Sequence, residues 1–317
     1  NQGQDVSARF ENYDFYTVLE LKPSDHLAIR PGFRYSFQSR FDNQYALSLG
    51  ARYNVNEKTE MRFGIGRSYR TPNFSEMYTY FVDSNHNLQG NKNLVPEQSW
   101  SLEYVLRKQW RQKENSNIVS QFSLNYMDVS DRISMALIGI VPTWQYKYIN
   151  VDDYKMWNAT LENTFLFKNG EMAIGGSLLG ISQEIHSPNL VSNSDFLYTY
   201  QFNAKLVYRE RWWKTQWALY FKHQGKQPQY VENTDENRNV SYVIANTQEY
   251  GWLDLSVTKK ILKEKLWLTL GARNLLNVQT INTTVPNTNV AHGATSNMIS
   301  LGYGTSYFFK LEYQLKL

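Results

Sequence analysis

The last nine residues, Phe309-Lys310-Leu311-Glu312-Tyr313-Gln314-Leu315-Lys316-Leu317, alternate apolar and polar side chains without interruption. Side chains on a β-strand point to opposite faces with a period of two, so the odd-numbered residues share one face and the even-numbered ones share the other. Such a strand separates an apolar phase from water. The stretch therefore predicts a β-protein and leaves open whether the apolar phase is a protein core or a lipid bilayer.

The same alternation recurs along the chain. The clearest examples lie at 29–37, 44–52, 60–66, 101–107, 121–126, 198–208, 253–257 and 266–270. Amphipathic helices would instead repeat apolar residues at spacings of three and four, and the sequence shows no such stretch. The sequence predicts an all-β chain.

Composition excludes several classes of protein. The 317 residues have a mean hydropathy of −0.55 and no run of eighteen apolar residues, which excludes a transmembrane helix. Cysteine is absent, so there is no disulfide framework, thiolate metal site or cysteine nucleophile. The net charge of +4 is dispersed, which argues against a nucleic-acid partner. Residues 1–5 lack the pattern of an export signal, so either the protein is not exported or its N-terminal part lies outside this chain.

Aromatic residues and connection lengths favour the lipid alternative. Aromatic residues make up 15% of the chain, with 23 Tyr and 9 Trp, and amphipathic rings accumulate at membrane interfaces. Short turns alternate with mostly longer connections, notably 69–98, 226–246 and 275–302, as in outer-membrane barrels. Five tryptophans near the short turns suit an aromatic girdle, namely Trp110, Trp212, Trp213, Trp217 and Trp267. A soluble β-sandwich or propeller remains the alternative, although no repeat of 40–50 residues is evident.

Two sequence boxes resemble a known family. Tyr69-Arg70-Thr71-Pro72 ends one expected strand, and Asn91-Lys92-Asn93-Leu94-Val95-Pro96-Glu97 opens the next. Both boxes, at this separation, resemble the Tyr/Phe-Arg-Ala-Pro and Asn-Pro-x-Leu-x-Pro-Glu boxes of TonB-dependent outer-membrane receptors. Thr71 and Lys92 replace the family's Ala and Pro. Near the C-terminus, Asn274-Leu275-Leu276-Asn277 resembles the element after the family's penultimate strand. The motif positions are Tyr69, Arg70, Pro72, Asn91, Leu94, Pro96 and Glu97, and we expect Arg70 and Glu97 to position the loop.

The resemblance implies that residues 1–317 form the C-terminal part of an antiparallel transmembrane β-barrel in the bacterial outer membrane. About 13 strands of a 22-stranded barrel are expected. The family's N-terminal plug domain and first strands are absent from this chain. An open wall leaves two unpaired edges, which lipid does not tolerate. We therefore expect the rest of the barrel and plug, as a separate chain or as another part of the same protein, to close it.

The resemblance also implies active import of a scarce nutrient. The candidates are haem, an iron–siderophore or cobalamin as transported ligand, with no resident cofactor. The expected partners are the TonB complex, through the absent plug, and outer-membrane lipid; a surface lipoprotein is a further candidate. A passive porin or adhesion barrel without a plug, and a soluble carbohydrate-binding β-protein, are the alternative functions. No catalytic constellation is found among the five histidines, so no enzyme activity is expected.

Four residues between the two boxes are candidate ligand contacts. Haem receptors of the family carry a haem-ligating histidine there, and His86 occupies a similar position; the alternative is a solvated loop histidine. Tyr78, Tyr80 and Phe81 are candidates to stack on a porphyrin or a catechol, or else to belong to an extracellular aromatic girdle.

Four arginines fall on the polar side of the expected strands. Arg30, Arg34, Arg52 and Arg62 are predicted to face the lumen, where they would attract anionic ligands or pair with carboxylates of a plug. Pairing with a plug is the favoured interpretation. No metal site is predicted.

Overall fold

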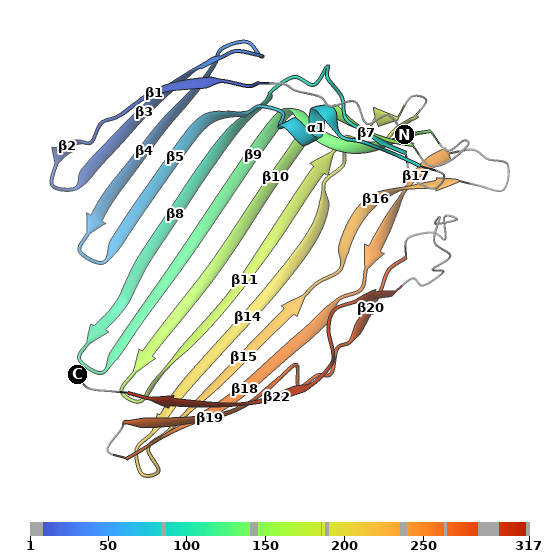
Figure 1. Ribbon diagram of the computed structural model, residues 1–317. Coiled ribbons are helices and arrows are strands. Elements are labelled where there is room, and N and C mark those ends of the chain that lie inside the picture. Colours follow the sequence, from blue (N-terminus) through green and yellow to red (C-terminus); the bar gives the residue numbers. More distant parts are fainter. Residues whose placement is uncertain are drawn as a thin grey trace.

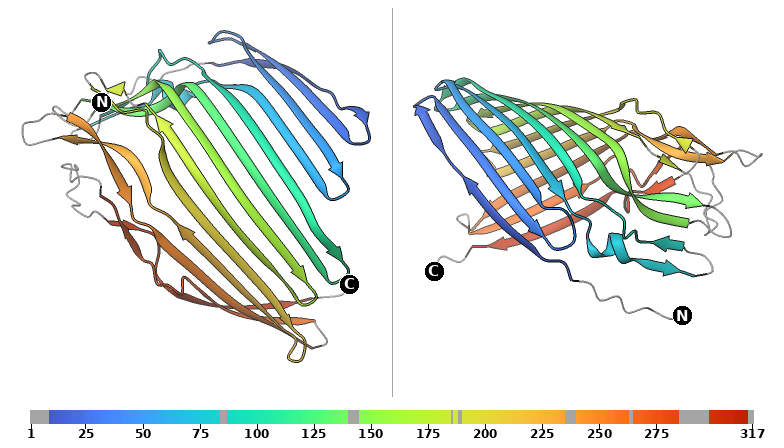
Figure 2. Two further views of the ribbon diagram at one scale, coloured as in Figure 1. Left: turned by 180° about the vertical axis from the view of Figure 1, so that it is seen from behind. Right: turned by 90° about the horizontal axis from the view of Figure 1, so that it is seen from above.

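The computed structural model describes residues 9–83, 87–139, 145–184, 186–187, 190–234, 240–262, 265–284 and 298–314. Its main element is one large curved sheet that is open along one side (Figures 1 and 2). Thirteen strands follow one another along it, in the order β1 (Asn12–Val18), β3 (Leu27–Gln38), β4 (Gln44–Asn56), β5 (Thr59–Arg70), β8 (Glu97–Lys113), β9 (Ser116–Gly139), β10 (Gln145–Phe167), β11 (Gly170–Gln183), β14 (Leu197–Glu210), β15 (Thr215–Gln224), β18 (Tyr250–Ile261), β19 (Leu266–Arg273) and β22 (Ser306–Tyr313).

Spatial order along the sheet follows chain order, and each of these strands is antiparallel to the next. The prediction of an all-β antiparallel wall of about thirteen strands is therefore confirmed. Within the described residues β1 and β22 do not pair with each other. None of the described helices is long and apolar enough to cross a membrane.

The connections differ sharply between the two ends of the sheet. At one end, which we call the short-turn end, neighbouring strands are joined by tight turns such as 57–58, 114–115 and 168–169. The opposite, long-loop end carries the helix α1 (Phe74–Tyr78) and several strand pairs, among them β6 (Tyr80–Val82) with β7 (Asn87–Gln89), β16 (Gln227–Thr234) with β17 (Val240–Thr247), and β20 (Thr280–Asn282) with β21 (Met298–Ser300) (Figure 1). The three smaller strands β2 (Leu21–Ser24), β12 (His186–Ser187) and β13 (Leu190–Val191) complete the fold. The predicted alternation of short and long connections is present.

Strand register joins the apolar side chains into a continuous belt on one face of the sheet. One row across it runs Pro31, Leu49, Ile65, Leu102, Tyr126 and Trp157, each opposite the next. Many of these large apolar side chains are exposed, whereas only ten apolar residues of the described part of the chain are buried. A soluble sandwich would bury this face against a second sheet. The belt therefore has no protein core beneath it, and an exposed apolar surface of this extent marks contact with another apolar phase.

The final strand continues the belt. Phe309, Leu311 and Tyr313 are exposed, and they lie opposite Leu270, Leu268 and Leu266, respectively. Residues 315–317, the end of the alternating stretch, lie outside the described part of the chain.

The polar face of the sheet is the concave one. Helix α1 lies on the inner side of the curve (Figure 2), and its Glu76 contacts Arg70 and, through it, Glu97, which belong to the polar face of β5 and β8. The strand register contradicts the prediction that Trp267 belongs to the aromatic girdle. Trp267 lies opposite Lys260 and Glu312 on this polar face, and therefore does not belong to an outward girdle.

Three strands are much longer than the ten or so residues expected from bilayer thickness. β8 has 17 residues, β9 has 24 and β10 has 23. The hairpin of β9 and β10 extends past the belt at the long-loop end, where β10 pairs in parallel with β7. This extension gives the connection between β5 and β8 a surface on which to pack.

Candidate functional site

The candidate site is the connection between β5 and β8, which carries both sequence boxes and lies at the long-loop end on the concave side (Figures 1 and 2). We call residues 71–96 the strap. Its ends are adjacent, because Arg70 and Glu97 are directly opposite each other in the register of β5 and β8. The strap therefore leaves the wall and returns to it at one point.

Arg70 ties the strap to the wall through two carboxylates. Its Nε and Nη2 donate to Glu97 at 2.8 and 2.6 Å, in a two-pronged arrangement. Its Nη1 donates to both oxygens of Glu76 on α1, at 2.9 and 3.0 Å. Glu97 also accepts from the Ile133 amide of β9 at 2.7 Å. Such bidentate, charge-assisted bonds are among the strongest in proteins, so this cluster fixes α1 against two strands of the wall.

We call Arg70, Glu76 and Glu97 the clamp. Its hydrogen bonds shift the pKa of Glu97 and the pKa of Arg70. Burial alone would raise the pKa of Glu97, but the hydrogen bonds from Arg70 and the Ile133 amide outweigh burial, and the net pKa is lowered. Hydrogen bonding to Glu97 raises the pKa of the Arg70 guanidinium further. Glu97 and Arg70 are therefore both ionised at neutral pH. Its groups lie at the strand ends beyond the apolar belt.

Helix α1 begins with a complete capping box. The Asn73 side chain accepts from the Glu76 amide at 2.9 Å, and the Glu76 carboxylate accepts from the Asn73 amide at 2.8 Å. Pro72, directly before the cap, is buried. One glutamate thus both caps the helix and holds Arg70, which explains how a helix of only five residues keeps its position.

The strap has its own small hydrophobic core. Met77, Leu94 and Ile133 are buried together. Partly buried rings surround them, namely Phe10, Phe41, Tyr78 and Tyr148. Gly90 allows the two halves of the strap to meet, since a Cβ there would lie 2.5 Å from the Met77 carbonyl carbon.

Asparagines join the strap to the extended β9–β10 hairpin. Asn91 Nδ2 donates to the Tyr148 carbonyl at 2.9 Å. Asn150 of β10 both accepts from the Val95 amide and donates to the Val95 carbonyl, each at 3.0 Å, as a neighbouring strand would. Pro96, between Val95 and the clamp, is partly buried. Asn91 and Leu94 of the second box therefore have structural contacts that the sequence motif alone did not specify.

The C-terminal box organises the connection after β19. Asn274 is fully buried and has a positive φ of 54°. Its side chain accepts from the Val278 amide at 3.0 Å and donates to the Val278 carbonyl at 2.8 Å. Asn277 has the same φ, and its Oδ1 accepts from the Thr305 amide. Asparagine suits these positions because it tolerates left-handed backbone and bonds to nearby main-chain groups.

The candidate ligand contacts have different surroundings. The Tyr78 ring packs against two phenylalanine rings at the border of the strap core. The distance between ring centroids is 4.9 Å to Phe74 and 6.1 Å to Phe10. By contrast, Tyr80 is 77% exposed and Phe81 is 50% exposed on β6. His86 lies outside the described residues.

The four predicted lumen arginines lie on the concave face, and three of them find carboxylates within the wall. Arg30 pairs with Glu20 at 2.9 Å, Arg34 with Asp14 at 2.6 Å and Arg62 with Glu60 at 2.7 Å. Pairing of these arginines with carboxylates of a plug stays a prediction. Arg52 lies opposite Arg62 and has no ion pair within the described part of the chain.

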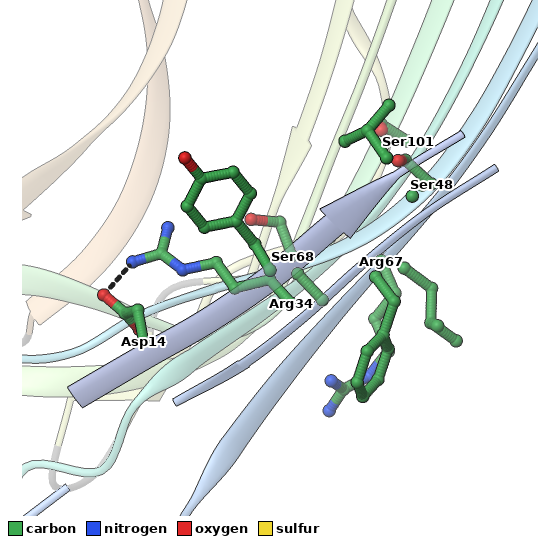
Figure 3. A pocket seen from close by; sticks show the side chains of 13 residues that line it. Asp14, Arg34, Ser48, Arg67, Ser68 and Ser101 are labelled. Carbon is green, nitrogen blue, oxygen red and sulfur yellow. Dashed lines mark hydrogen bonds and ion pairs between the residues drawn. The ribbon is translucent and has the colours of Figure 1, made fainter. Parts of the chain in front are cut away.

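The Asp14–Arg34 pair borders a groove of about 680 Å³ floored by small side chains, among them Gly32, Ser48 and Ser101. Figure 3 shows this pair and Arg67 on opposite sides of the strands. Arg67 therefore emerges among the apolar side chains. Its guanidinium stacks 3.8 Å over the Tyr45 ring and donates to Gln98 at 2.7 Å. The Arg67 guanidinium thus finds its ring contact and its hydrogen-bond acceptor within the wall, although its side chain lies on the apolar face.

Sequence reasoning missed a cavity of about 320 Å³ beside the clamp. It is lined by Arg70, Glu97, Met127, Arg132 and Tyr154, among others. The Arg132 guanidinium lies 4.0 Å over the Tyr154 ring. These two residues are 22 positions apart in the sequence, and only the pairing of β9 with β10 brings them together. The described residues contain no cluster of three metal-ligating side chains.

Solved structures share this fold. The siderophore receptor PirA from Pseudomonas aeruginosa is 16% identical, with a TM-score of 0.64 over 96% of this chain and 48% of that one. The FrpB iron transporter from Neisseria meningitidis is 13% identical, with a TM-score of 0.68 over 96% and 45%. The outer membrane transporter YddB from Escherichia coli is 12% identical, with a TM-score of 0.69 over 96% and 45%. The chain thus spans about half the length of these structures.

Comparison with curated protein sequences finds no match. The family model described as TonB dependent receptor-like, beta-barrel, matches residues 2–275. This match covers most of the strands and both strap boxes. The chain belongs to the TonB-dependent receptor family, and the matched residues are part of its β-barrel domain.

Proposed function

We propose that this chain forms part of the barrel wall of an outer-membrane receptor that imports an iron chelate, a ferric siderophore or haem, with energy from the TonB complex. Membership of the family supports the receptor and transport role. The siderophore receptor and the iron transporter among the similar structures favour an iron compound.

The two faces of the sheet suit this placement. The belt of exposed apolar side chains would contact lipid, and the concave arginine-bearing face would line the lumen. In outer-membrane barrels short turns face the periplasm and long loops face the outside. The strap would then stand at the extracellular mouth, and strands absent from this chain, with a plug, would complete the barrel.

One observation carries the choice of cargo: Tyr80 and Phe81 are exposed on the strap, which the Arg70 clamp and the strap core hold in place. A positioned ring loses little entropy when a flat ligand stacks on it. Aromatic faces suit catechols and porphyrins, and Arg132, in the cavity beside the clamp, adds positive charge for an anionic chelate. Cobalamin and oligosaccharides are less well matched to this combination.

Growth of a strain that lacks the receptor tests the cargo. Haem, a ferric siderophore or cobalamin would be supplied as the sole source of iron or cobalamin, with plasmid-borne wild type or the Tyr80→Ala/Phe81→Ala variant. We expect wild type to restore growth on one iron chelate and the variant to weaken ligand binding at least tenfold. Tyr198→Ala, at an exposed ring on the outer face, is the control and should behave as wild type. Restoration by cobalamin alone would refute the iron proposal.

Energy dependence separates this proposal from a passive porin. Uptake should stop when TonB is deleted or the proton-motive force is collapsed. Uptake that continues at the same rate under both conditions would favour the porin.

The haem alternative has its own test at His86. Loss of haem binding in His86→Ala, with binding retained in His26→Ala at the short-turn end, would support haem ligation. His26 is a suitable control because its Nδ1 lies 3.1 Å from the Asn54 carbonyl, far from the strap. Unchanged haem binding in His86→Ala would remove the ligand role and leave the siderophore as cargo.

A further inference from the structure

Two tryptophans project from the turn between β14 and β15 at the short-turn end. Trp212 is 92% exposed and Trp213 is 72% exposed. The cause is local: the Glu210 carboxylate accepts from the amides of both residues, which folds the main chain back and leaves the indoles outside. This arrangement also occupies the acidic side chain of the turn.

Basic residues lie in the same turn and in the neighbouring one. Arg211 and Lys214 belong to the same turn, and both are exposed. The neighbouring β18–β19 turn is joined to it, because the Lys260 amide donates to the Lys214 carbonyl at 3.3 Å. Lys259, near the end of β18, and Lys265, in that turn, are also exposed. Across the described ranges none of these four cations forms an ion pair with an acidic side chain. We call Trp212, Trp213, Arg211, Lys214, Lys259 and Lys265 the tryptophan–cation patch.

The other short turns of the described chain contain no tryptophan among their turn residues. The turns at 57–58, 114–115 and 168–169 contain no aromatic residue. Trp110 lies near one of them, but its indole donates to Ser120 at 2.9 Å and has the Lys108 ammonium 3.9 Å over its ring. The patch is therefore a particular feature of β14 to β19 rather than of the whole rim.

The patch is continuous with the apolar belt. Tyr208 lies opposite Trp217, and Trp217 lies opposite Val257, on the apolar face just before the turn. Lys259 lies on the same face, opposite Leu268. Going along the strands, the surface thus changes from apolar to aromatic and then to cationic, which is the sequence of environments at the edge of a bilayer.

We propose that the tryptophan–cation patch binds the phosphate of anionic glycerophospholipids, such as phosphatidylglycerol, in the leaflet that faces the short turns. Indoles favour the headgroup level, and basic residues near a membrane surface attract anionic lipid. An acidic protein partner fits less well, because the patch borders the lipid-facing belt directly. This inference rests on the proposed membrane placement.

Lipid titration of the intact receptor, purified from outer membranes and delipidated in neutral detergent, tests the inference. Native mass spectrometry would count bound phosphatidylglycerol and phosphatidylethanolamine at low salt. We expect wild type to prefer phosphatidylglycerol, and Arg211→Gln/Lys214→Gln to lose at least about fivefold in its affinity. The control, Lys113→Gln/Lys168→Gln, removes two exposed cations from other short turns and should retain the preference. A Trp212→Ala/Trp213→Ala variant should weaken binding of both lipids.

Two results would overturn the inference. Wild type could show no preference between the lipids, or the test and control variants could lose affinity equally, which would indicate general surface electrostatics. Fractionation of cells would keep these outcomes separate from the proposed function. A receptor found in the outer membrane without the lipid preference contradicts only the patch, whereas a receptor absent from that membrane contradicts the proposed function itself.

Discussion

The outer face of the wall and the core of the strap are opposite solutions to the burial of apolar side chains. On the wall, residues such as Leu102 and Leu161 remain exposed on the sheet surface, and backbone pairing holds the strands together. In the strap, Met77 and Leu94 are almost fully buried against Ile133, and side-chain contacts determine the structure. In the proposed placement the first region would have lipid as its solvent, whereas the second is packed like a water-soluble protein.

This difference teaches where each region is vulnerable. A wall bathed in lipid should tolerate changes of apolar shape and reject charge. A packed core should reject cavities, and a clamp of charges should respond to loss of a charge. The contacts that join the strap to the wall are the Arg70 clamp, the strap core, the pairing of β7 with β10 and the asparagine bonds to the β9–β10 hairpin, so changes at these places should act on the strap more than on the wall.

The largest effect is expected from a cavity in the strap. Leu94→Ala should lower the free energy of opening of the strap by about 2–5 kcal/mol, because a buried leucine leaves a void. Hydrogen exchange at the Gly90 and Asn91 amides, which bond to Thr79 and Glu76, would report the opening. Val95→Ala is the control, since that side chain is exposed and should cost less than about 0.5 kcal/mol. Equal effects of the two changes would mean that the strap has no specific core.

A charge in the belt should come next. Leu161→Arg places a guanidinium near the middle of the apolar face and should cost the whole receptor about 2–4 kcal/mol of unfolding free energy in lipid. The adjacent Glu162→Arg introduces the same side chain on the concave face and should cost far less. Denaturant titration in phospholipid vesicles would measure both. The reverse order of costs would mean that the lipid and lumen faces have been exchanged.

Removal of one clamp charge should have a smaller, local effect. Glu97→Gln keeps the shape but loses charge-assisted bonds to Arg70, and the strap should open more easily by about 1.5–3 kcal/mol. Glu103→Gln, on the same strand and the same face but exposed, is the matched control. Exchange rates that change equally in both variants would show that the clamp does not hold the strap.

The smallest effect should appear on acidification. The pKa of Glu97 is lowered from its ordinary value of 4.5, so the ionised carboxylate stabilises the closed strap. That stabilisation is complete above about pH 4.5, the value of the open state, and is lost as the pH falls through the lowered value of the closed state. Amide exchange, corrected for its intrinsic pH dependence, should therefore accelerate in wild type below that pH. Glu97→Gln should lack this component; if it keeps the full pH response, another group is responsible.

Much of the wall was predictable, and the reason is its geometry. Alternation assigned the faces of β3, β4, β5 and β22, because a strand has a period of two and each of these strands has one wet face. The prediction for Trp267 was wrong because nearness to a turn does not determine the face of a strand. Trp267 lies opposite Glu312 and alternates with Leu266 and Leu268 of its own strand, which places it on the polar face. The partners of Arg30 and Arg34 were missed because Glu20 and Asp14 belong to segments that strand pairing brings near.

The sequence by itself therefore determined the all-β class, the two faces of the wall, the ends with short and long connections, and the boxes that identify the family. These are local properties, set by the period of a strand and by the spacing of residues along the chain. Only the tertiary structure decided that the boxes form a clamp and a small core. Glu97 meets the Ile133 amide 36 residues away, and Asn150 meets Val95 from 55 residues away. Contacts at such separations depend on strand register and sheet curvature, which no local pattern encodes.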